Sequence, residues 1–270
     1  MIEYVFAFFI AILIGLVASV IGVGGGFLYV PALTFLFGID QKTAIGTSLT
    51  IIVFTSLTGC LSYCRQRRIF YKSALFIIIP SVIFAAIGSY ATIFVPGAIL
   101  SVVFSVFLIL VAVNMVVPAL PFIFSLKCGP CFDEECRDCF SITASVRAYY
   151  LHLFFWGAVA GFIGGITGIG GGVINVPALN TLGMPIHFAA ATSVLVILAT
   201  SITGAVVHQR LGQVAIDYAV SFSLGGIIGA YIGANLAPKI RSRHLEFAFS
   251  IFLLVMSVAI LLETLLSIVR

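Results

Sequence analysis

Long apolar runs constrain this chain more than any other feature of its sequence. Eight of them are each about 18–24 residues long, and about 20 apolar residues suffice for a helix to span the hydrocarbon core of a bilayer. Only 8% of the residues are charged, whereas a soluble domain keeps about 25%, so lipid must cover most of the surface. The sequence therefore predicts an all-α polytopic membrane protein that is surrounded by the lipid bilayer. The runs cover residues 4–21, 43–63, 73–94, 97–120, 148–167, 188–207, 216–236 and 245–268.

The net charge of +4 comes largely from basic residues in the short segments between these runs. Basic loops of this kind indicate membrane topology. The chain has no basic stripe with interleaved aromatic residues, so we expect no nucleic-acid partner. Residues 1–20 lack the basic start of a signal peptide, and we expect them to form a retained first helix. We predict a multi-pass protein of the cell (inner) membrane.

An internal repeat organises the chain. Residues 22–33 read GVGGGFLYVPAL and residues 168–179 read GIGGGVINVPAL, and eight of these twelve positions are identical. The likeness returns about twenty residues later, because residues 44–63 and 189–208 share two Thr-Ser pairs and one Thr-Gly pair in the same order. Both matches together indicate that one hydrophobic module occurs twice.

The repeat divides the chain into two homologous halves. We predict membrane repeat one at residues 1–120 and membrane repeat two at residues 146–270, joined by a cytoplasmic, cysteine-rich connecting loop at 121–145. The basic clusters at 65–72 and 239–243 both face the cytoplasm only if the two repeats are inverted relative to each other. Charge therefore favours inverted repeats.

Inversion requires an odd number of membrane crossings in each repeat. Each repeat has four clear spanning helices, and the fifth candidate is the short segment after the glycines, at 27–38 and 173–183. Pro31 and Pro177 keep these segments short or kinked. Such half-helices must be buried in protein, because irregular backbone is not tolerated against lipid. Paired, broken segments at matching positions of two repeats are typical of a transporter's binding site.

The glycine-rich turns before the half-helices are the candidate binding site. A helix that starts after glycines presents free backbone N–H groups and the positive end of its dipole, which together favour an anion. From Ser73 to Leu126 the chain has no charged side chain, so backbone N–H and hydroxyl groups would have to hold an anionic substrate. The alternative is that these small and hydroxylated residues only pack membrane helices together. The candidate substrate-binding residues are Gly24, Gly25, Gly26, Thr47, Ser48, Gly170, Gly171, Gly172, Thr192 and Ser193.

The doubled GxGGGxxxxPxL motif, each copy followed by a Ser/Thr-rich helix that contains Thr-Gly, resembles the TauE/SafE family of sulfite and organosulfonate transporters. The likeness covers residues 5–120 and 148–268. The repeated features carry no catalytic side chain, so we expect the protein not to be an enzyme. The resemblance implies transmembrane movement of a small sulfur oxyanion or organosulfonate, such as sulfite or sulfoacetate, usually as export. The cysteine-rich connecting loop departs from the bare family pattern.

Four cysteines, Cys128, Cys131, Cys136 and Cys139, form two C-x-x-C pairs in the connecting loop. Cytoplasmic thiols stay reduced, and two such pairs can supply four sulfur ligands to one tetrahedral zinc ion. The gap between the pairs is much shorter than in a zinc ribbon. We predict a zinc site, and the alternatives are a redox or regulatory thiol pair, or inert or disulfide-linked cysteines.

Two functions can be compared on these features. An anion that leaves a negative cell interior gains about 2.3 kcal/mol per charge per 100 mV, and no buried Asp or Glu indicates a proton relay, so passive efflux is expected. The alternative is a membrane thiol-redox or sulfur-relay protein that uses Cys60, Cys64 and the connecting-loop cysteines. Only repeat one carries cysteines at membrane depth, so the repeated features favour transport.

Overall fold

The structure, a computed structural model, describes residues 2–97 and 145–237, together with positions 99, 100, 102, 105, 106, 109, 254, 255 and 258. Within this part of the chain every regular element is a helix, which confirms the all-α prediction. The elements are α1 (Ile2–Ile21), α2 (Gly26–Pro31), the π-helical turn η1 (Ala32–Leu36), α3 (Gln41–Arg65), α4 (Tyr71–Ala91), α6 (Ser145–Thr167), α7 (Gly172–Thr181), α8 (Ile186–Arg210) and α9 (Ile216–Leu236).

Six of the described helices, α1, α3, α4, α6, α8 and α9, are long and apolar enough to cross a membrane, which confirms a multi-pass membrane protein. The predicted runs at 97–120 and 245–268 lie mostly outside the described residues. Large apolar side chains remain exposed on the outer faces, among them Leu13, Ile83 and Leu151. Continuous exposed apolar surface of this kind is the part of the protein that lipid covers.

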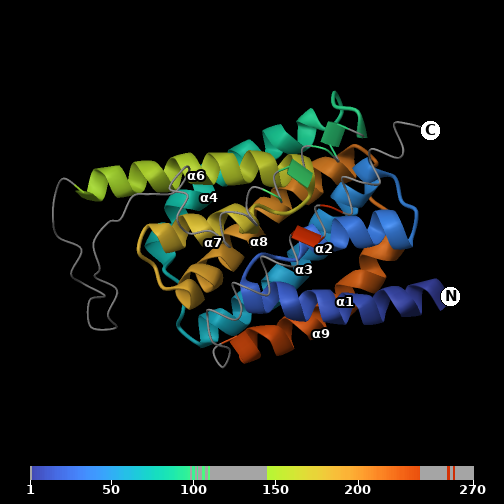
Figure 1. The fold of residues 1–270 in the computed structure, drawn as a ribbon, viewed down its shortest axis with the longest axis horizontal. Helices are drawn as coiled ribbons and strands as arrows, with labels where there is room; N and C mark the ends of the chain where they lie inside the picture. The colour runs from blue at the N-terminus through green and yellow to red at the C-terminus, as the bar shows by residue number, and fades with distance from the viewer. Residues whose placement is uncertain are drawn as a thin grey trace.

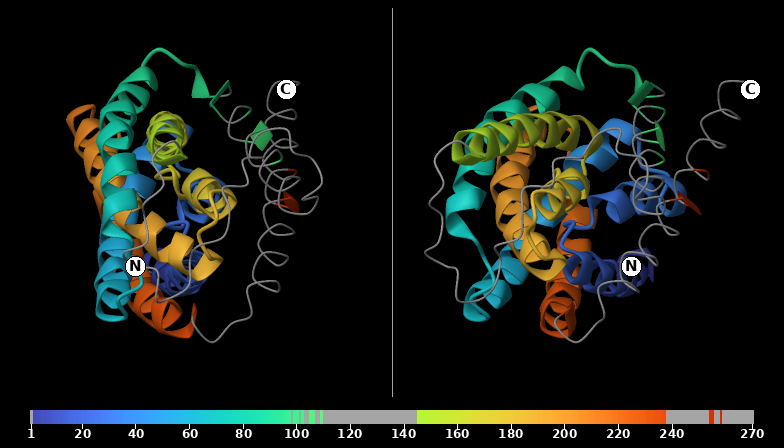
Figure 2. Two further views of the ribbon diagram at one scale, coloured as in Figure 1. Left: turned by 90° about the vertical axis from the view of Figure 1, so that its left-hand side faces the viewer. Right: turned by 60° about the vertical axis from the view of Figure 1, so that its left-hand side comes forward.

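Helices of the two repeats are interleaved. Helices α3 and α8 pack against each other in the centre, with α4 and α6 paired on one side and α1 and α9 paired on the other (Figure 1). The views in Figure 2 also show α6 beside α4 and α1 beside α9. Because α1 and α4 come from repeat one and α6 and α9 from repeat two, both outer pairs combine the two repeats. The two halves therefore form one helical unit.

The predicted half-helices are present and short. Helix α2 continues through η1 as one apolar helix, Gly26–Leu36, and α7 is its counterpart in repeat two. Proline has no N–H group to continue the α-helical pattern, and α2 widens into the π-helical turn directly after Pro31. The Thr34 hydroxyl donates to the carbonyl oxygens of Val30 and Pro31, each at 3.1 Å, which satisfies two acceptors where the helix changes.

The two outer helix pairs depend on glycines that let backbones touch. On α6, a Cβ at Gly161 would overlap the Ser81 carbonyl of α4. On α9, a Cβ at Gly229 would overlap the Ile12 carbonyl of α1 and lie 2.8 Å from the Leu16 nitrogen. Small residues at this spacing are the usual close-packing device of membrane helices. The α6 and α9 glycines thus serve packing.

We predict that Gly229→Ala separates α1 from α9 and destabilises the protein by about 1–3 kcal/mol, the usual cost of overpacking. The measurement is the thermal unfolding midpoint of the detergent-solubilised protein. Gly97→Ala is the matched control, because a Cβ there would meet only the Gln41 Cβ at 3.7 Å. Equal midpoints for the two variants would contradict the close α1–α9 packing.

Candidate functional site

Each half-helix begins at a turn of consecutive glycines with positive φ. Gly24 and Gly25 have φ values of 84° and 86°, and Gly170 and Gly171 have 75° and 83°. Gly25 and Gly171 are the N-caps of α2 and α7. This left-handed conformation is strained for any residue with a Cβ. The sequence prediction that the chain unwinds at the glycines and then restarts as a helix is therefore confirmed.

The two glycine turns touch each other at the centre of the protein. A Cβ at Gly26 would overlap the Gly168 carbonyl oxygen and lie 2.6 Å from the Ile169 Cα. A Cβ at Gly172 would likewise overlap the carbonyl oxygen of Val23. The first residue of each half-helix therefore rests on the backbone of the opposite turn. Tertiary packing brings together two segments that are far apart in the sequence.

Isoleucine side chains from the central helices close around this junction. A Cβ at Gly24 would lie 2.8 Å from the Ile197 Cγ2 of α8, and one at Gly26 would lie 2.7 Å from the Ile52 Cδ1 of α3. Both isoleucines are fully buried. Neither turn contains a charged residue, so the polar groups at the junction are backbone amides and nearby hydroxyls.

The hydroxyls of Thr47 and Thr192 make matching contacts between the repeats. The Ala215 N–H before α9 donates to the Thr47 oxygen at 2.9 Å, and the Phe70 N–H before α4 donates to the Thr192 oxygen at 3.2 Å. Each threonine thus caps the start of a helix from the other repeat, and both threonines are fully buried. The oxygens of both threonines therefore already accept a hydrogen bond from the protein. Direct contact of Thr47 or Thr192 with a substrate stays a prediction.

Ser48 and Ser193 occupy equivalent positions but differ in their bonding. The Ser48 hydroxyl donates to the Gly168 carbonyl of the opposite glycine turn at 2.8 Å. The Ser193 hydroxyl is fully buried and has no hydrogen-bond partner among the described residues. Ser48 therefore lies directly against a glycine turn, and its contact with a substrate stays a prediction. Ser193 keeps a free donor.

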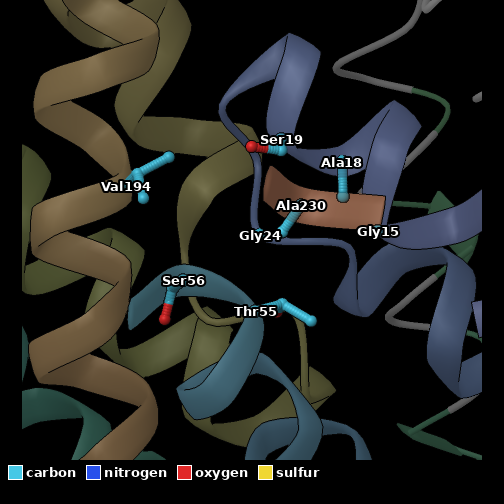
Figure 3. Close-up of a pocket in the computed structure, with 8 residues that line it drawn as sticks. All are labelled: Gly15, Ala18, Ser19, Gly24, Thr55, Ser56, Val194 and Ala230. Carbon is cyan, nitrogen blue, oxygen red and sulfur yellow. The ribbon is translucent and has the colours of Figure 1, made fainter. Parts of the chain in front are cut away.

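A small cavity lies beside the first glycine turn (Figure 3). Its volume is about 10 Å³, roughly the space for one water molecule. An oxyanion with several heavy atoms is larger than that, so this cavity does not accommodate one. In repeat two, the Thr200 hydroxyl donates to the Gly170 carbonyl at 2.8 Å, whereas Thr55 bonds within its own helix. The cavity is lined by Gly15, Ala18, Ser19, Gly24, Thr55, Ser56, Val194 and Ala230.

Three buried polar side chains near the turns were not predicted as site residues. The Ser19 hydroxyl and both amide atoms of Asn175 have no hydrogen-bond partner in the described part of the chain, and the Tyr29 hydroxyl lies beside Thr55 of α3. The sequence carries a signal for two of them. Tyr29 and Asn175 occupy the same position of the repeated motif, and each is the sole polar side chain between its glycines and its proline. Nothing in the sequence distinguishes Ser19.

The predicted zinc ligands Cys128, Cys131, Cys136 and Cys139 lie outside the described residues. Among the residues that are described, no group of three or more His, Cys, Asp or Glu side chains could hold a metal ion. Cys60 and Cys64 are free thiols on one face of α3, with their sulfur atoms 3.9 Å apart.

Spanning helices arranged around two short, glycine-started helices define a multi-pass membrane transporter. The sulfite exporter TauE/SafE family model matches residues 7–260, and this chain belongs to that family. The matched range includes most of both repeats and all of the described helices except the first residues of α1.

Curated relatives agree with this class. The chain is 31% identical to the probable membrane transporter protein YunE of Bacillus subtilis, over 95% of this chain and 98% of that protein. It is 30% identical to a probable membrane transporter protein of Methanocaldococcus jannaschii, over 94% of this chain and 93% of that protein. A sulfite exporter TauE/SafE family protein 5 of Arabidopsis thaliana is 30% identical over 40% of this chain and 23% of its own length. No solved structure matches the chain.

The cross-repeat threonine contacts can be tested for stability and for transport separately. We predict that Thr47→Val or Thr192→Val lowers the thermal unfolding midpoint, because an N–H group left without a partner costs about 1–3 kcal/mol. Thr58→Val is the matched control, since that hydroxyl bonds only to the Phe54 carbonyl of its own helix. A raised KM with an unchanged midpoint would instead make these threonines substrate ligands.

Proposed function

We propose that this protein exports a small sulfur-containing anion across the cell membrane: sulfite, sulfoacetate or a related organosulfonate. The observation that carries the proposal is the meeting of two glycine-started helices at the protein centre, where Gly26 and Gly172 each rest on the opposite turn. The anion would be held by backbone N–H groups at Gly24–Gly26 and Gly170–Gly172. Membership of the sulfite exporter family supports the sulfur oxyanion as the substrate class.

Electrostatics favours an anion at this place. The positive ends of two helix dipoles converge where no basic side chain is present, and such ends attract negative charge by about 0.3–2 kcal/mol each. Backbone N–H groups at a helix start also donate hydrogen bonds to oxyanions. An anion bound without Arg or Lys is not trapped by a fixed full charge, which suits transport because the substrate must also leave.

The membrane potential can drive export. A negative cell interior contributes about 2.3 kcal/mol per charge per 100 mV to the exit of an anion. Neither glycine turn contains an acidic side chain that could relay protons. We therefore expect passive, potential-driven efflux without a coupled proton.

Inverted repeats would provide the two access states. The paired contacts Thr47–Ala215 and Thr192–Phe70 link equivalent points of the two repeats, as a twofold relation between them requires. The cavity beside Gly24 is water-sized, so binding of an anion there would require the surrounding helices to move apart. Opening on one side and then the other would follow if the helix pair α1–α9 and the pair α4–α6 move against the central helices. Inversion of the repeats stays a prediction.

A thiol-redox or sulfur-relay function is the second candidate, since the Cys60 and Cys64 sulfurs lie 3.9 Å apart. Their counterparts in repeat two are Ala205 and Gln209, so the pair is not part of the repeated architecture. A Cys60→Ser, Cys64→Ser double variant that keeps full sulfite efflux would eliminate this function.

The transport site is tested by efflux of labelled sulfite from proteoliposomes under an imposed potential, beside sulfate and chloride. We predict that Gly25→Ala or Gly171→Ala reduces saturable sulfite efflux by roughly tenfold or more, equivalent to about 1.4 kcal/mol. Gly212→Ala is the matched control, because it has a similar positive φ of 69° and open space around its Cβ position. Unchanged efflux in both site variants would rule out the glycine turns as the binding site.

Zinc at the connecting loop is a separate proposal. We expect about one zinc ion per purified chain, lost in a Cys128→Ser, Cys131→Ser double variant, because a tetrahedral site needs four ligands. Metal analysis by mass spectrometry measures this directly. Absence of zinc and iron from the folded wild-type protein would leave the thiol-pair and disulfide alternatives.

A further inference from the structure

We propose that Cys60 and Cys64 form a two-thiolate binding site for a soft metal ion, copper(I), near the end of α3. The site goes beyond the export function, and its test does not depend on transport. It is also separate from the zinc site predicted in the connecting loop. Neither the family match nor the names of the relatives assign a metal to these two residues.

The two sulfur atoms lie where one ion can reach both. Cys60 and Cys64 are four residues apart on α3, so their side chains lie on one face of the helix. Two histidines at this spacing on a helix bind one zinc ion in the same way. The thiols are free and their sulfur atoms are 3.9 Å apart. With metal–sulfur bonds of about 2.3 Å, two sulfurs on one ion are about 3.8 Å apart at a tetrahedral angle and about 4.6 Å apart in a line. The observed separation falls within that range.

The helix disfavours a disulfide between the same two cysteines. Residues four apart on a helix have Cβ atoms about 5–6 Å apart, whereas a disulfide needs Cβ atoms about 3.5–4.5 Å apart. A disulfide would therefore distort α3, while an ion between the sulfurs spans the wider gap. The basic segment at 65–72 that follows is predicted to face the cytoplasm, where thiols stay reduced. The pair is thus available as a metal ligand.

A hydroxyl group and an apolar cluster surround the pair. The Tyr71 hydroxyl of α4 donates to the Cys64 sulfur at 3.4 Å. A hydrogen-bond donor at sulfur favours the thiolate, which is the form that binds metal. Cys60 is 6% exposed and belongs to a buried cluster with Val20 of α1 and Ala234 of α9. Water is therefore excluded around Cys60, whereas the partly exposed Cys64 leaves a way in for the ion.

These groups occur together in repeat one and are replaced together in repeat two. The counterparts of Cys60, Cys64 and Tyr71 are Ala205, Gln209 and Ile216. The packing that both repeats share does not require the thiols, since the alanine at 205 is buried in its own repeat. A separate role for the thiol pair accounts for its presence in one repeat.

The donor atoms select the ion. Soft thiolate ligands favour copper(I) over harder ions. A structural zinc ion almost always takes four ligands, and among the described residues no third His, Cys, Asp or Glu side chain joins the pair. Copper(I) is satisfied by two thiolates. The bound unit carries one net negative charge, and the basic Arg65 directly follows Cys64 in the chain.

The test is an anaerobic titration of the detergent-solubilised full-length protein with copper(I), in competition with a colorimetric copper(I) chelator. The connecting-loop thiols are first removed by Cys128→Ser, Cys131→Ser, Cys136→Ser and Cys139→Ser, so that Cys60 and Cys64 are the remaining cysteines. We expect one tightly bound copper(I) ion per chain, with two sulfur neighbours by X-ray absorption.

Replacement of the pair by the residues of repeat two, Cys60→Ala and Cys64→Gln, should abolish this binding. Tyr71→Phe should weaken it by about tenfold, the usual cost of losing a hydrogen bond to a metal ligand. Ser62→Ala is the matched control, because Ser62 lies between the cysteines on α3 and its hydroxyl donates to the Thr58 carbonyl of the same helix. Copper binding in this control should not change.

A second measurement applies if the protein without connecting-loop thiols does not fold. Wild-type protein should then bind one copper(I) ion more per chain than the Cys60→Ala, Cys64→Gln variant. Equal copper binding with and without the pair would overturn the site. A disulfide between Cys60 and Cys64 in protein purified anaerobically would also overturn it, because the thiols would then be unavailable to the ion.

Discussion

Backbone polar groups inside a bilayer must find partners within the protein, and the two glycine turns meet this constraint at the centre of the structure. Each turn leaves the regular helical pattern, with positive φ at Gly24, Gly25, Gly170 and Gly171. This irregular backbone is tolerated because each turn is covered by the other turn and by the central helices α3 and α8. Interleaving of the two repeats is what provides that cover.

The same contacts that shield the turns also join the repeats. Thr47 and Thr192 cap helices of the opposite repeat, and Ser48 bonds to the opposite glycine turn. These bonds are few and directional, and each connects a buried hydroxyl of one repeat to the backbone of the other.

The sequence predicted much of the architecture because its signals are local. Runs of about 20 apolar residues specify spanning helices, and glycine clusters followed by proline specify a turn and a short helix. Both half-helices were found close to their predicted bounds, with α7 at Gly172–Thr181 against a predicted 173–183. The glycine turns of the candidate site were likewise evident from the doubled motif alone.

The partners of individual hydroxyls could not be predicted in this way. Sequence placed Thr47, Ser48, Thr192 and Ser193 on matching helices, but only packing decided that the threonines cap α9 and α4 while Ser193 stays unpaired. It also decided that the buried amide of Asn175 has no partner within the described part of the protein. The sequence by itself determined the helices, their repetition and the places where they break, because these follow from hydrophobicity and backbone freedom along the chain. The tertiary structure alone decided which polar atoms are satisfied, because a hydrogen bond between helices depends on positions more than a hundred residues apart, as between Ser48 and Gly168.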